Sequence, residues 1–307
     1  MLATKENVAR LSILAVSLLI AIKVVASILT GSIAILADAV HSVIDLSGVV
    51  IGYIGIRVSA KPADEEHAFG HGKAENIAGG IIAGLIFVAA GIIFYQAVRN
   101  LITGAAVELV TAGIFITAGA IVINLLISRY ALKVARATDS LALEATARDM
   151  TADVLSSAAV LVGLVLVRVT GNNMLDPIVA MLVAVLIAVT AYFTIRKSLS
   201  GLMDTRLPKA EEDELIAIIS EHTTQVAGFH KLRTRKAGSQ RFIDLHLMLP
   251  KNASVEEAHQ MCDHLEQDIE NRLPNSSVTI HVEPCSVECE QCLVSPCSLR
   301  PAKDRDK

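Results

Sequence analysis

Six apolar stretches fill most of the amino-terminal two thirds of this 307-residue chain, and they indicate whether this part lies in water or in lipid. They run over residues 11–29, 32–55, 77–98, 109–128, 151–169 and 177–195. Each is close to the ~20 residues with which an α-helix crosses the hydrocarbon core of a bilayer. Backbone groups in lipid must form their hydrogen bonds internally, which favours helices. The sequence therefore predicts an α-helical membrane bundle of six transmembrane helices.

The distribution of charge divides the chain. Apolar residues make up 53% of it, yet charged residues are scarce before Lys209 and dense after it. We predict a transmembrane domain over residues 1–205, a soluble cytosolic domain over 206–287 and a cysteine-containing tail over 288–307. The tail ends in RPAKDRDK and is expected to be disordered. A net charge of −4, the absence of Trp and the lack of a long basic run exclude a nucleic-acid binder.

Lys and Arg gather on one side of the predicted bundle. Only Arg99 and Arg168 fall on the other side, whereas the first side holds Lys5, Arg10, Arg57, Lys61, Lys73, Arg129, Lys133, Arg136, Arg196 and Lys197. Basic connections stay in the cytosol, so we expect a multi-pass protein of the cell (inner or plasma) membrane with both termini cytosolic. The first stretch could instead be a signal peptide, but it is too long, and its removal would leave an odd number of helices.

Ionisable residues stand inside two of the predicted helices. DAVHSVID places Asp38, His41 and Asp45 on one helical face, and ARDMTAD places Asp149 and Asp153 four residues apart. Two such helices together supply four ligands to one ion, which predicts a tetrahedral metal site. Proton relays or buried hydrogen-bonded pairs are the alternatives, and Asn124 could simply bond between helices. Uncompensated burial of so many ionisable groups is expensive, which favours the metal site.

The connection after the second stretch reads KPADEEHAFGHGKAEN. Asp64, His67 and His71 form a compact set of oxygen and nitrogen ligands in it, and Gly70 and Gly72 let the chain fold back. We predict a second metal site here.

For the soluble part the sequence predicts elements in the order αββαβ, with helices over 211–221 and 255–272 and strands over 230–235, 241–249 and 278–282. Ser254 and Glu257 form a capping-box pattern before the second helix.

These motifs together resemble the cation diffusion facilitators, particularly the bacterial members that export ferrous iron and zinc. The resemblance covers nearly the whole chain: the six helices, LADAVHSVID, FGHGKAE, LDPIVA, LMD and the soluble domain. It implies a transport site at His41, Asp45, Asp149 and Asp153, with Asp38 as a neighbour, and a loop site at Asp64, His67 and His71. It also implies a charge pair between Lys73 and Asp204 near the cytosolic surface.

For the soluble domain the resemblance implies a metallochaperone-like fold that pairs two chains into a homodimer. A two-metal site near that interface would use the residues His230, His246, His259, His281 and Glu283. Glu283 stands where relatives have Asp. His222 and His264 match no ligand position and are expected to be solvated.

The expected cargo and regulatory ligand is Zn²⁺ or Fe²⁺, with Mn²⁺, Co²⁺ and Cd²⁺ as alternatives. Zinc-selective relatives have His at the first ligand position of helix five, whereas this chain has His in helix two and Asp in helix five, so the ligands leave the metal open. Cys285, Cys289, Cys292 and Cys297 have a spacing that could hold zinc or an iron–sulfur cluster, against a reactive, disordered tail. Cytosolic thiols stay reduced.

The expected function is that of a secondary transporter, not an enzyme. The chain would export a divalent metal by alternating access, in exchange for protons that compete for the same ligands. An intramembrane metal hydrolase is a poorer alternative because HExxH is absent. A membrane-anchored metal sensor or scaffold is the other alternative, and four intact intramembrane ligands argue against it.

Overall fold

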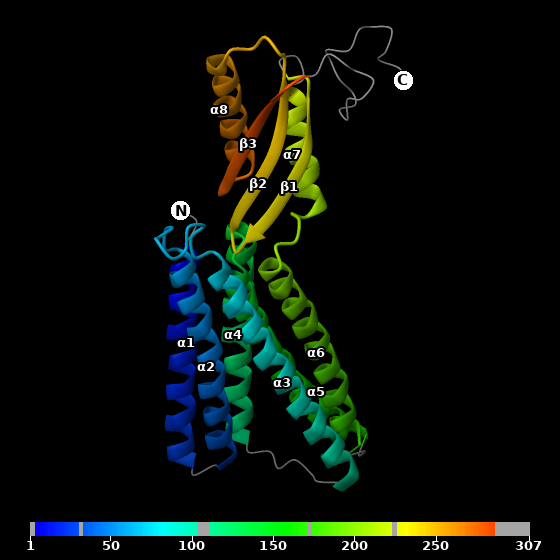
Figure 1. Cartoon of the computed structure of the whole chain (residues 1–307). Coiled ribbons are helices and arrows are strands. Elements are labelled where there is room, and N and C mark those ends of the chain that lie inside the picture. The colour runs from blue at the N-terminus through cyan, green and yellow to red at the C-terminus, as the bar shows by residue number, and fades with distance from the viewer. Residues whose placement is uncertain (1–3, 31–32, 104–110, 171–173, 223–225, 286–307) are drawn as a thin grey trace. The chain divides into compact units, whose positions relative to one another are not determined.

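A computed structural model describes residues 4–30, 33–103, 111–170, 174–222 and 226–285. The chain forms two compact units, which we call the helical unit (Met1–Leu202) and the C-terminal unit (Met203–Lys307). Both confirm the predicted fold class, a six-helix bundle and a small αββαβ domain. Figure 1 shows the elements in each unit.

The helical unit consists of six long helices. In chain order they are α1 (Lys5–Thr30), α2 (Ile33–Ser59), α3 (Lys73–Thr103), α4 (Thr111–Thr138), α5 (Leu141–Thr170) and α6 (Leu175–Leu202). Helix α3 packs along α6, α4 along α5 and α1 along α2, while α2, α3 and α5 meet in the middle. Within the described residues, three segments are long and apolar enough to cross a bilayer by length and composition: Lys73–Thr103, Ala118–Thr138 and Pro177–Leu202.

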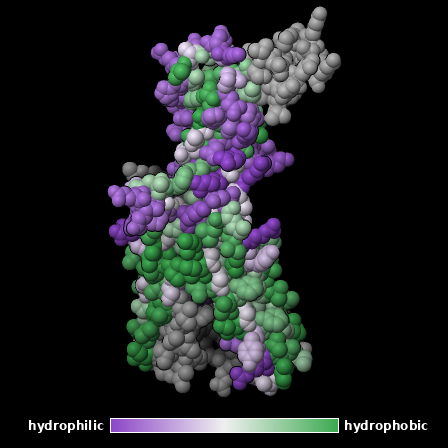
Figure 2. Space-filling model, viewed as in Figure 1, coloured by the Kyte–Doolittle hydropathy of each residue, from purple (hydrophilic) through white to green (hydrophobic). Residues whose placement is uncertain are grey.

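Small residues let the central helices approach closely. A side chain at Gly52 of α2 would overlap Thr146 of α5, and one at Gly55 would overlap Ala78 of α3. Large apolar side chains point outward instead, among them Leu14, Ile28, Val88 and Leu182, and Figure 2 shows that apolar residues predominate on the visible face of this unit. A water-facing surface would not carry so many exposed apolar residues, which fits a helical unit that lies in lipid.

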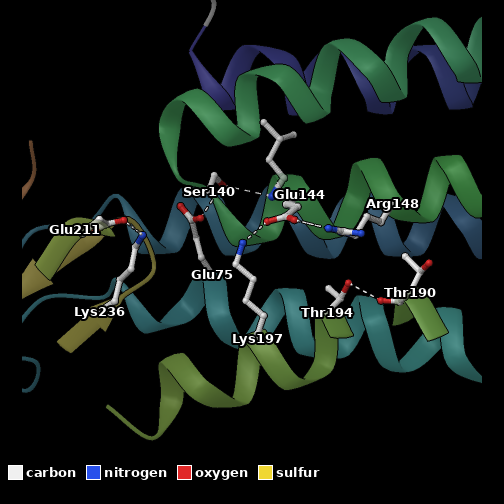
Figure 3. A network of polar contacts seen from close by, with 10 residues as sticks. Glu75, Ser140, Glu144, Arg148, Thr190, Thr194, Lys197, Glu211 and Lys236 are labelled. Carbon is white, nitrogen blue, oxygen red and sulfur yellow. Dashed lines mark hydrogen bonds and ion pairs between the residues drawn. The ribbon is translucent and has the colours of Figure 1, made fainter. Parts of the chain in front are cut away.

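A buried carboxylate joins the helix ends on the side of the α2–α3 loop. Glu75, in the first turn of α3, is fully buried and forms an ion pair with Lys5 of α1. Ser59 at the end of α2 donates to its Oε1 at 3.0 Å, and Ser140, directly before α5, donates to its Oε2 at 2.6 Å. Figure 3 shows Glu75 and Ser140 in this network. Glu75 therefore ties four helices together at one end.

A second polar contact joins α5 to α6. Glu144 accepts from Lys197 of α6 at 2.6 Å and from Arg148, one turn further along α5, at 2.8 Å (Figure 3). The two cations compensate the negative charge of Glu144, which lies in the first turn of α5.

The C-terminal unit contains a three-stranded sheet and two helices. The elements are α7 (Lys209–Glu221), β1 (Gly228–Ala237), β2 (Gln240–Leu249), α8 (Val255–Arg272) and β3 (Ser276–Pro284). The sheet order is β1-β2-β3, with β1 antiparallel and β3 parallel to β2. Its core is formed by apolar residues of α7, α8 and one face of β2, including Leu215, Ile218, Ile243, Leu245, Leu247, Leu265 and Ile269. The other face of the sheet carries the remaining β2 side chains.

The predicted capping box at the start of α8 is confirmed. Ser254 accepts from the backbone N–H of Glu257 at 3.1 Å, and the carboxylate of Glu257 accepts from the backbone N–H of Ser254 at 2.7 Å. Both helix-end donors are thereby satisfied. The strands are one to four residues longer than predicted, because backbone pairing continues at their ends beyond the alternating apolar residues that the sequence pattern detects.

Candidate metal centres

A small cavity between α1, α2, α4 and α5 brings three carboxylates together. Asp45, Asp149 and Asp153 line it, and its volume of about 20 Å³ is close to what a single water-sized particle needs. The remaining walls are Ser42, Asn124 and the apolar residues Val16, Leu19, Val49 and Met150. We call this the carboxylate cavity. Three acids around a space for one particle make a cation the fitting occupant.

Helix geometry places these acids. Asp149 and Asp153 are one turn apart on α5, so both face α2. Asp45 lies on α2 one turn before Gly48, and a Cβ at Gly48 would lie 3.0 Å from Oδ2 of Asp149. The missing side chain at this position thus leaves the space that the Asp149 carboxylate occupies.

Two predicted members of this site cannot be placed. Asp38 and His41 belong to α2, but their side chains lie outside the described residues. The structure therefore brings together three of the four predicted transport ligands, and His41 stays a prediction, as does Asp38 beside it.

Asn124 of α4, considered from the sequence only as a possible hydrogen bond between helices, forms such a bond in this site. Its Nδ2 donates to Oδ2 of Asp153 at 2.7 Å, and its Oδ1 is buried with no hydrogen-bond partner among the described residues. Hydrogen bonds to a metal-binding carboxylate orient it, and an amide oxygen is itself a hard ligand. The sequence signal is only a lone amide in an apolar helix.

A larger cavity of about 360 Å³ adjoins the same acids. Asp45 and Asp149 line it together with Gly48, Ser156, Gln96 and a row of apolar residues on α3 from Ile82 to Ile93. It extends along α3 toward the end of the helix at Thr103 and away from the Glu75 network. The acids thus lie between a small closed space and a larger one.

The α2–α3 loop forms the second predicted centre, the loop cluster of Asp64, His67 and His71. Asp64 Oδ1 accepts from the backbone N–H of His67 at 2.7 Å and lies 3.1 Å from its Nδ1, while Oδ2 lies 3.3 Å from Nε2 of His71. The backbone N–H of His67 holds the pKa of Asp64 below its ordinary value, and both imidazoles act in the same direction. Gly70 adopts a positive φ of 75° where the loop turns back. The three ligand atoms lie within 4.8 Å of one another.

Strand register builds the third centre on the open face of the sheet. His246 of β2 lies opposite His230 of β1 and beside His281 of β3, so one imidazole from each strand stands in a row. A bulge follows His230, with Lys231 at a positive φ of 52°. Glu283 lies two residues beyond His281 and thus on the same face of β3.

The side chains in this row converge on one carboxylate. Glu283 Oε1 lies 2.7 Å from Nδ1 of His246 and 3.7 Å from Nε2 of His281, and its Oε2 lies 3.2 Å from Nε2 of His230. The hydrogen bond from His246 holds the pKa of Glu283 below its ordinary value, and His230 acts in the same direction. Nδ1 of His230 is buried with no hydrogen-bond partner among the described residues. We call His230, His246, His281 and Glu283 the sheet cluster, and its donor set fits a divalent transition metal.

His259 does not join the sheet cluster within one chain. It lies on α8, where its side chain is 75% exposed and its Nδ1 is 3.3 Å from Asp263.

Lys73 and Asp204, the predicted charge pair, each have other contacts. Lys73 donates to the carbonyl oxygen of Leu202 at 3.5 Å, and Asp204 accepts from Arg235 at 3.2 Å. The charge pair between Lys73 and Asp204 stays a prediction.

The cysteines divide into two groups. Cys262 is buried on α8, and burial raises the pKa of its thiol, with Glu266 and Asp263 adding to the effect. Cys285 is partly buried at the end of the described chain. Cys289, Cys292 and Cys297 lie outside the described residues, so a metal site in the tail stays a prediction.

The expectation that His222 is solvated is wrong. It stands directly after α7, and its side chain is only 10% exposed because α8 packs over it. Its Nε2 lies 3.2 Å from Asp268 of α8, and His264 lies one turn before Asp268. His264 itself is exposed as expected, at 61%.

Comparisons with known proteins agree with this architecture. A family model described as the cation efflux transmembrane domain matches residues 9–203, and one described as the cation efflux protein, cytoplasmic domain, matches residues 207–285. The uncharacterized transporter sll1263 of Synechocystis is 34% identical over 263 residues, which are 86% of this chain and 85% of the relative. The cation-efflux pump FieF of Salmonella typhi is 35% identical over 271 residues, 88% of this chain and 90% of that pump.

A solved structure described as that of "a Putative Zinc Transporter CzrB (Zn form)" is 38% identical, covers 26% of this chain and 90% of its own, and has a TM-score of 0.25. The match of the first family model to well over half of the chain, together with the relatives, identifies the family. This chain is a membrane-embedded member of the cation diffusion facilitators.

Proposed function

We propose that this protein exports a divalent transition metal from the cytosol in exchange for protons, by alternating access. The carboxylate cavity is the observation that carries the proposal, because three acids from two helices line a space for one particle. Zn²⁺ and Fe²⁺ are the proposed cargo, and Mn²⁺, Co²⁺ and Cd²⁺ compete for the same ligands. Asp45, Asp149 and Asp153 bind the ion, with His41 as fourth ligand.

Proton coupling follows from the chemistry of the ligands. A metal ion needs ionised carboxylates and a neutral imidazole, so each bound proton removes a ligand. Three acids around one small space repel one another when all are ionised, which makes proton uptake favourable whenever the metal leaves. Metal release on the outer side and proton release on the inner side then follow from one set of groups.

The larger cavity beside Asp45 and Asp149 supports a route for the ion. It begins at two of the proposed ligands and runs along α3 toward Thr103. If both termini are cytosolic, this direction leads to the outer side, so the cavity is the proposed release path. Its wall on α3 is mostly apolar, which keeps the ion from binding a second time.

Transport into proteoliposomes tests the proposal. Purified protein is reconstituted with an imposed pH gradient, and uptake of each metal is followed together with internal pH. We expect one or more metals to move with counterflow of protons, and Asp153→Ala to abolish both. Glu65→Ala, in the exposed α2–α3 loop, is the matched control and keeps full activity. Metal uptake that continues unchanged in Asp153→Ala would overturn the site.

The same experiment separates transport from sensing. If no metal crosses while the C-terminal unit still binds it, the chain is a membrane-anchored metal sensor or scaffold.

We infer that the protein lies in the cell (inner or plasma) membrane with both termini in the cytosol. In a variant without native cysteines, a thiol at Glu65 should resist an impermeant reagent in intact cells and react after lysis. A thiol at Asn172, in the connection after α5, should react in intact cells. The reverse pattern would invert the orientation and the direction of transport.

We also propose that two chains pair through their C-terminal units and that metal on the sheet cluster strengthens this pairing. His281 and His259 support this because their side chains are 64% and 75% exposed, which leaves them accessible to a second chain. The residues that would hold the metal in one chain are His230, His246 and Glu283.

A further inference from the structure

His222, His264 and Asp268 form a third cluster in the C-terminal unit, which we call the helix cluster. His222 Nε2 lies 3.2 Å from Oδ2 of Asp268, and His264 Nε2 lies 3.8 Å from the same oxygen. The three ligand atoms lie within 4.8 Å of one another, and the two imidazole rings meet edge to face at 5.2 Å. One ligand comes from the end of α7 and two come from α8.

The distances fit the coordination sphere of zinc. Bonds of about 2.0–2.1 Å in a tetrahedron place neighbouring ligand atoms about 3.4 Å apart. The observed separations of 3.2 and 3.8 Å from the Asp268 oxygen lie on either side of that value. Two imidazoles and one carboxylate are also a ligand set that zinc uses when its fourth position holds water.

The ring of His222 is oriented for metal binding. Its Nδ1 lies 3.0 Å from the carbonyl oxygen of Ile218, and since that oxygen only accepts, Nδ1 carries the proton. In the neutral ring this leaves a lone pair on Nε2, which faces the carboxylate of Asp268. A backbone carbonyl that fixes the tautomer of a histidine is the usual outer partner of a metal ligand.

Two lone pairs that face each other at 3.2 Å need a cation between them. A proton would give a simple ion pair between His222 and Asp268, whereas a metal ion would also engage His264. His264 favours the metal ion over the proton, because an ion pair between His222 and Asp268 needs no third residue. Arg272, one turn further along α8, is bound by Glu221 at 2.6 and 2.8 Å and approaches Glu214 at 3.6 Å, so its ion pairs are with these two acids.

Access and location suit a separate centre. His222 is 10% exposed and anchors the site, while His264 at 61% and Asp268 at 38% leave it open to solvent. The helices cover the face of the sheet opposite to the one that carries His246, so the helix cluster and the sheet cluster lie on different sides. We propose that the helix cluster is a zinc-class metal site that fastens the end of α7 to α8, independent of both the transport site and the sheet cluster.

Zinc stoichiometry of the full-length protein in lipid nanodiscs tests this site. Equilibrium dialysis followed by metal analysis should show one zinc fewer per chain in His222→Asn and in Asp268→Asn than in the wild type. Asn at position 222 keeps a donor for the Ile218 carbonyl and loses only the Nε2 ligand. Glu270→Gln, an exposed acid on α8, is the control that removes the same charge and should keep the wild-type number.

Amide hydrogen exchange gives a second readout on the same samples. Zinc should slow exchange in the last turn of α7 and in the middle of α8 of the wild type, and leave Asp268→Asn unchanged. Asp268→His, which restores a ligand, should recover both the zinc and the protection, so a variant that fails to fold is recognised.

Equal zinc binding in wild type and both ligand variants would reduce the cluster to a His–Asp ion pair and overturn the proposal. A loss of zinc in Glu270→Gln as large as in Asp268→Asn would also overturn it, since the acidic helix would then collect zinc diffusely. Because binding is measured without a gradient, neither result depends on whether the protein transports metal.

Discussion

Gly48 leaves room for the carboxylate of Asp149 because it has no side chain. Gly48→Ala places a methyl group 3.0 Å from Oδ2 of Asp149, so this carboxylate must move by a few tenths of an ångström. We expect the metal concentration for half-maximal uptake to rise roughly tenfold or more, as for other changes that misplace a metal ligand. Proteoliposome uptake measures it.

Gly84→Ala is the matched control for this substitution. A Cβ at Gly84 of α3 meets no atom within 4 Å. Alanine is the better helix former by about 1 kcal/mol, so this variant should transport normally and be slightly more stable. Equal affinity in both variants would show that Asp149 does not need its present position.

The residues of the carboxylate cavity were predictable to different degrees. Asp149 and Asp153 stand one turn apart within seven letters of sequence, so helical spacing alone pairs them. Asn124 has no such local signal, because its partner Asp153 lies 29 residues further on another helix. His222 was misjudged for the same reason, since its burial depends on how α7 packs against α8.

Among the elements, the first turn of α3 contacts three neighbouring segments through Glu75. Glu75→Gln removes the charge opposite Lys5 and one acceptor for Ser59 and Ser140. We expect the free energy of unfolding to fall by about 2–4 kcal/mol, because the partly buried Lys5 ammonium loses its charged partner. Thermal unfolding in detergent measures it, and Glu65→Gln, in the exposed loop, should leave the melting temperature unchanged.

Helix α8 depends on pH through its capping box. The backbone N–H of Ser254 holds the pKa of Glu257 below its ordinary value. A carboxylate with a lowered folded pKa stabilises the fold above its unfolded pKa, and this contribution is lost as pH falls through the folded value. Glu257→Gln should therefore melt below the wild type at pH 7, and the difference should shrink as the pH falls through the folded pKa of Glu257. A difference in melting temperature that persists in acid would contradict the charge argument.

Apolar periodicity and helix signals were enough to predict the elements of both units, including the αββαβ order and the cap of α8. The register of the sheet was not predictable, because the bulge after His230 decides which residue of β1 faces His246. The row of three imidazoles therefore appears only in the folded sheet, although each histidine was selected by its resemblance to relatives.

At the scale of the whole molecule, we expect metal binding at the sheet cluster to strengthen the association of two chains. Removal of metal with a chelator should weaken the association of two full-length chains by roughly tenfold or more, since a ligand that binds only the paired state stabilises it. Analytical ultracentrifugation in detergent, with and without added zinc, measures the association. His246→Ala is the variant in which zinc should no longer matter. Identical association in chelator and zinc would rule out a regulatory sheet cluster.

The network around Glu75 also has a consequence for the proposed alternating-access cycle. Helices that are held together at one end can separate more easily at the other end, and they then tilt about the contacts that hold them. Helix α3 has 31 residues and is therefore about 46 Å long, so a tilt of about 5° at Glu75 moves its far end by about 4 Å. That displacement is enough to admit or release a bare metal ion. In the proposed alternating-access cycle, opening at the end near Glu75 would require its contacts with Lys5, Ser59 and Ser140 to break. We therefore expect the state that is open at that end to be the more costly of the two to reach.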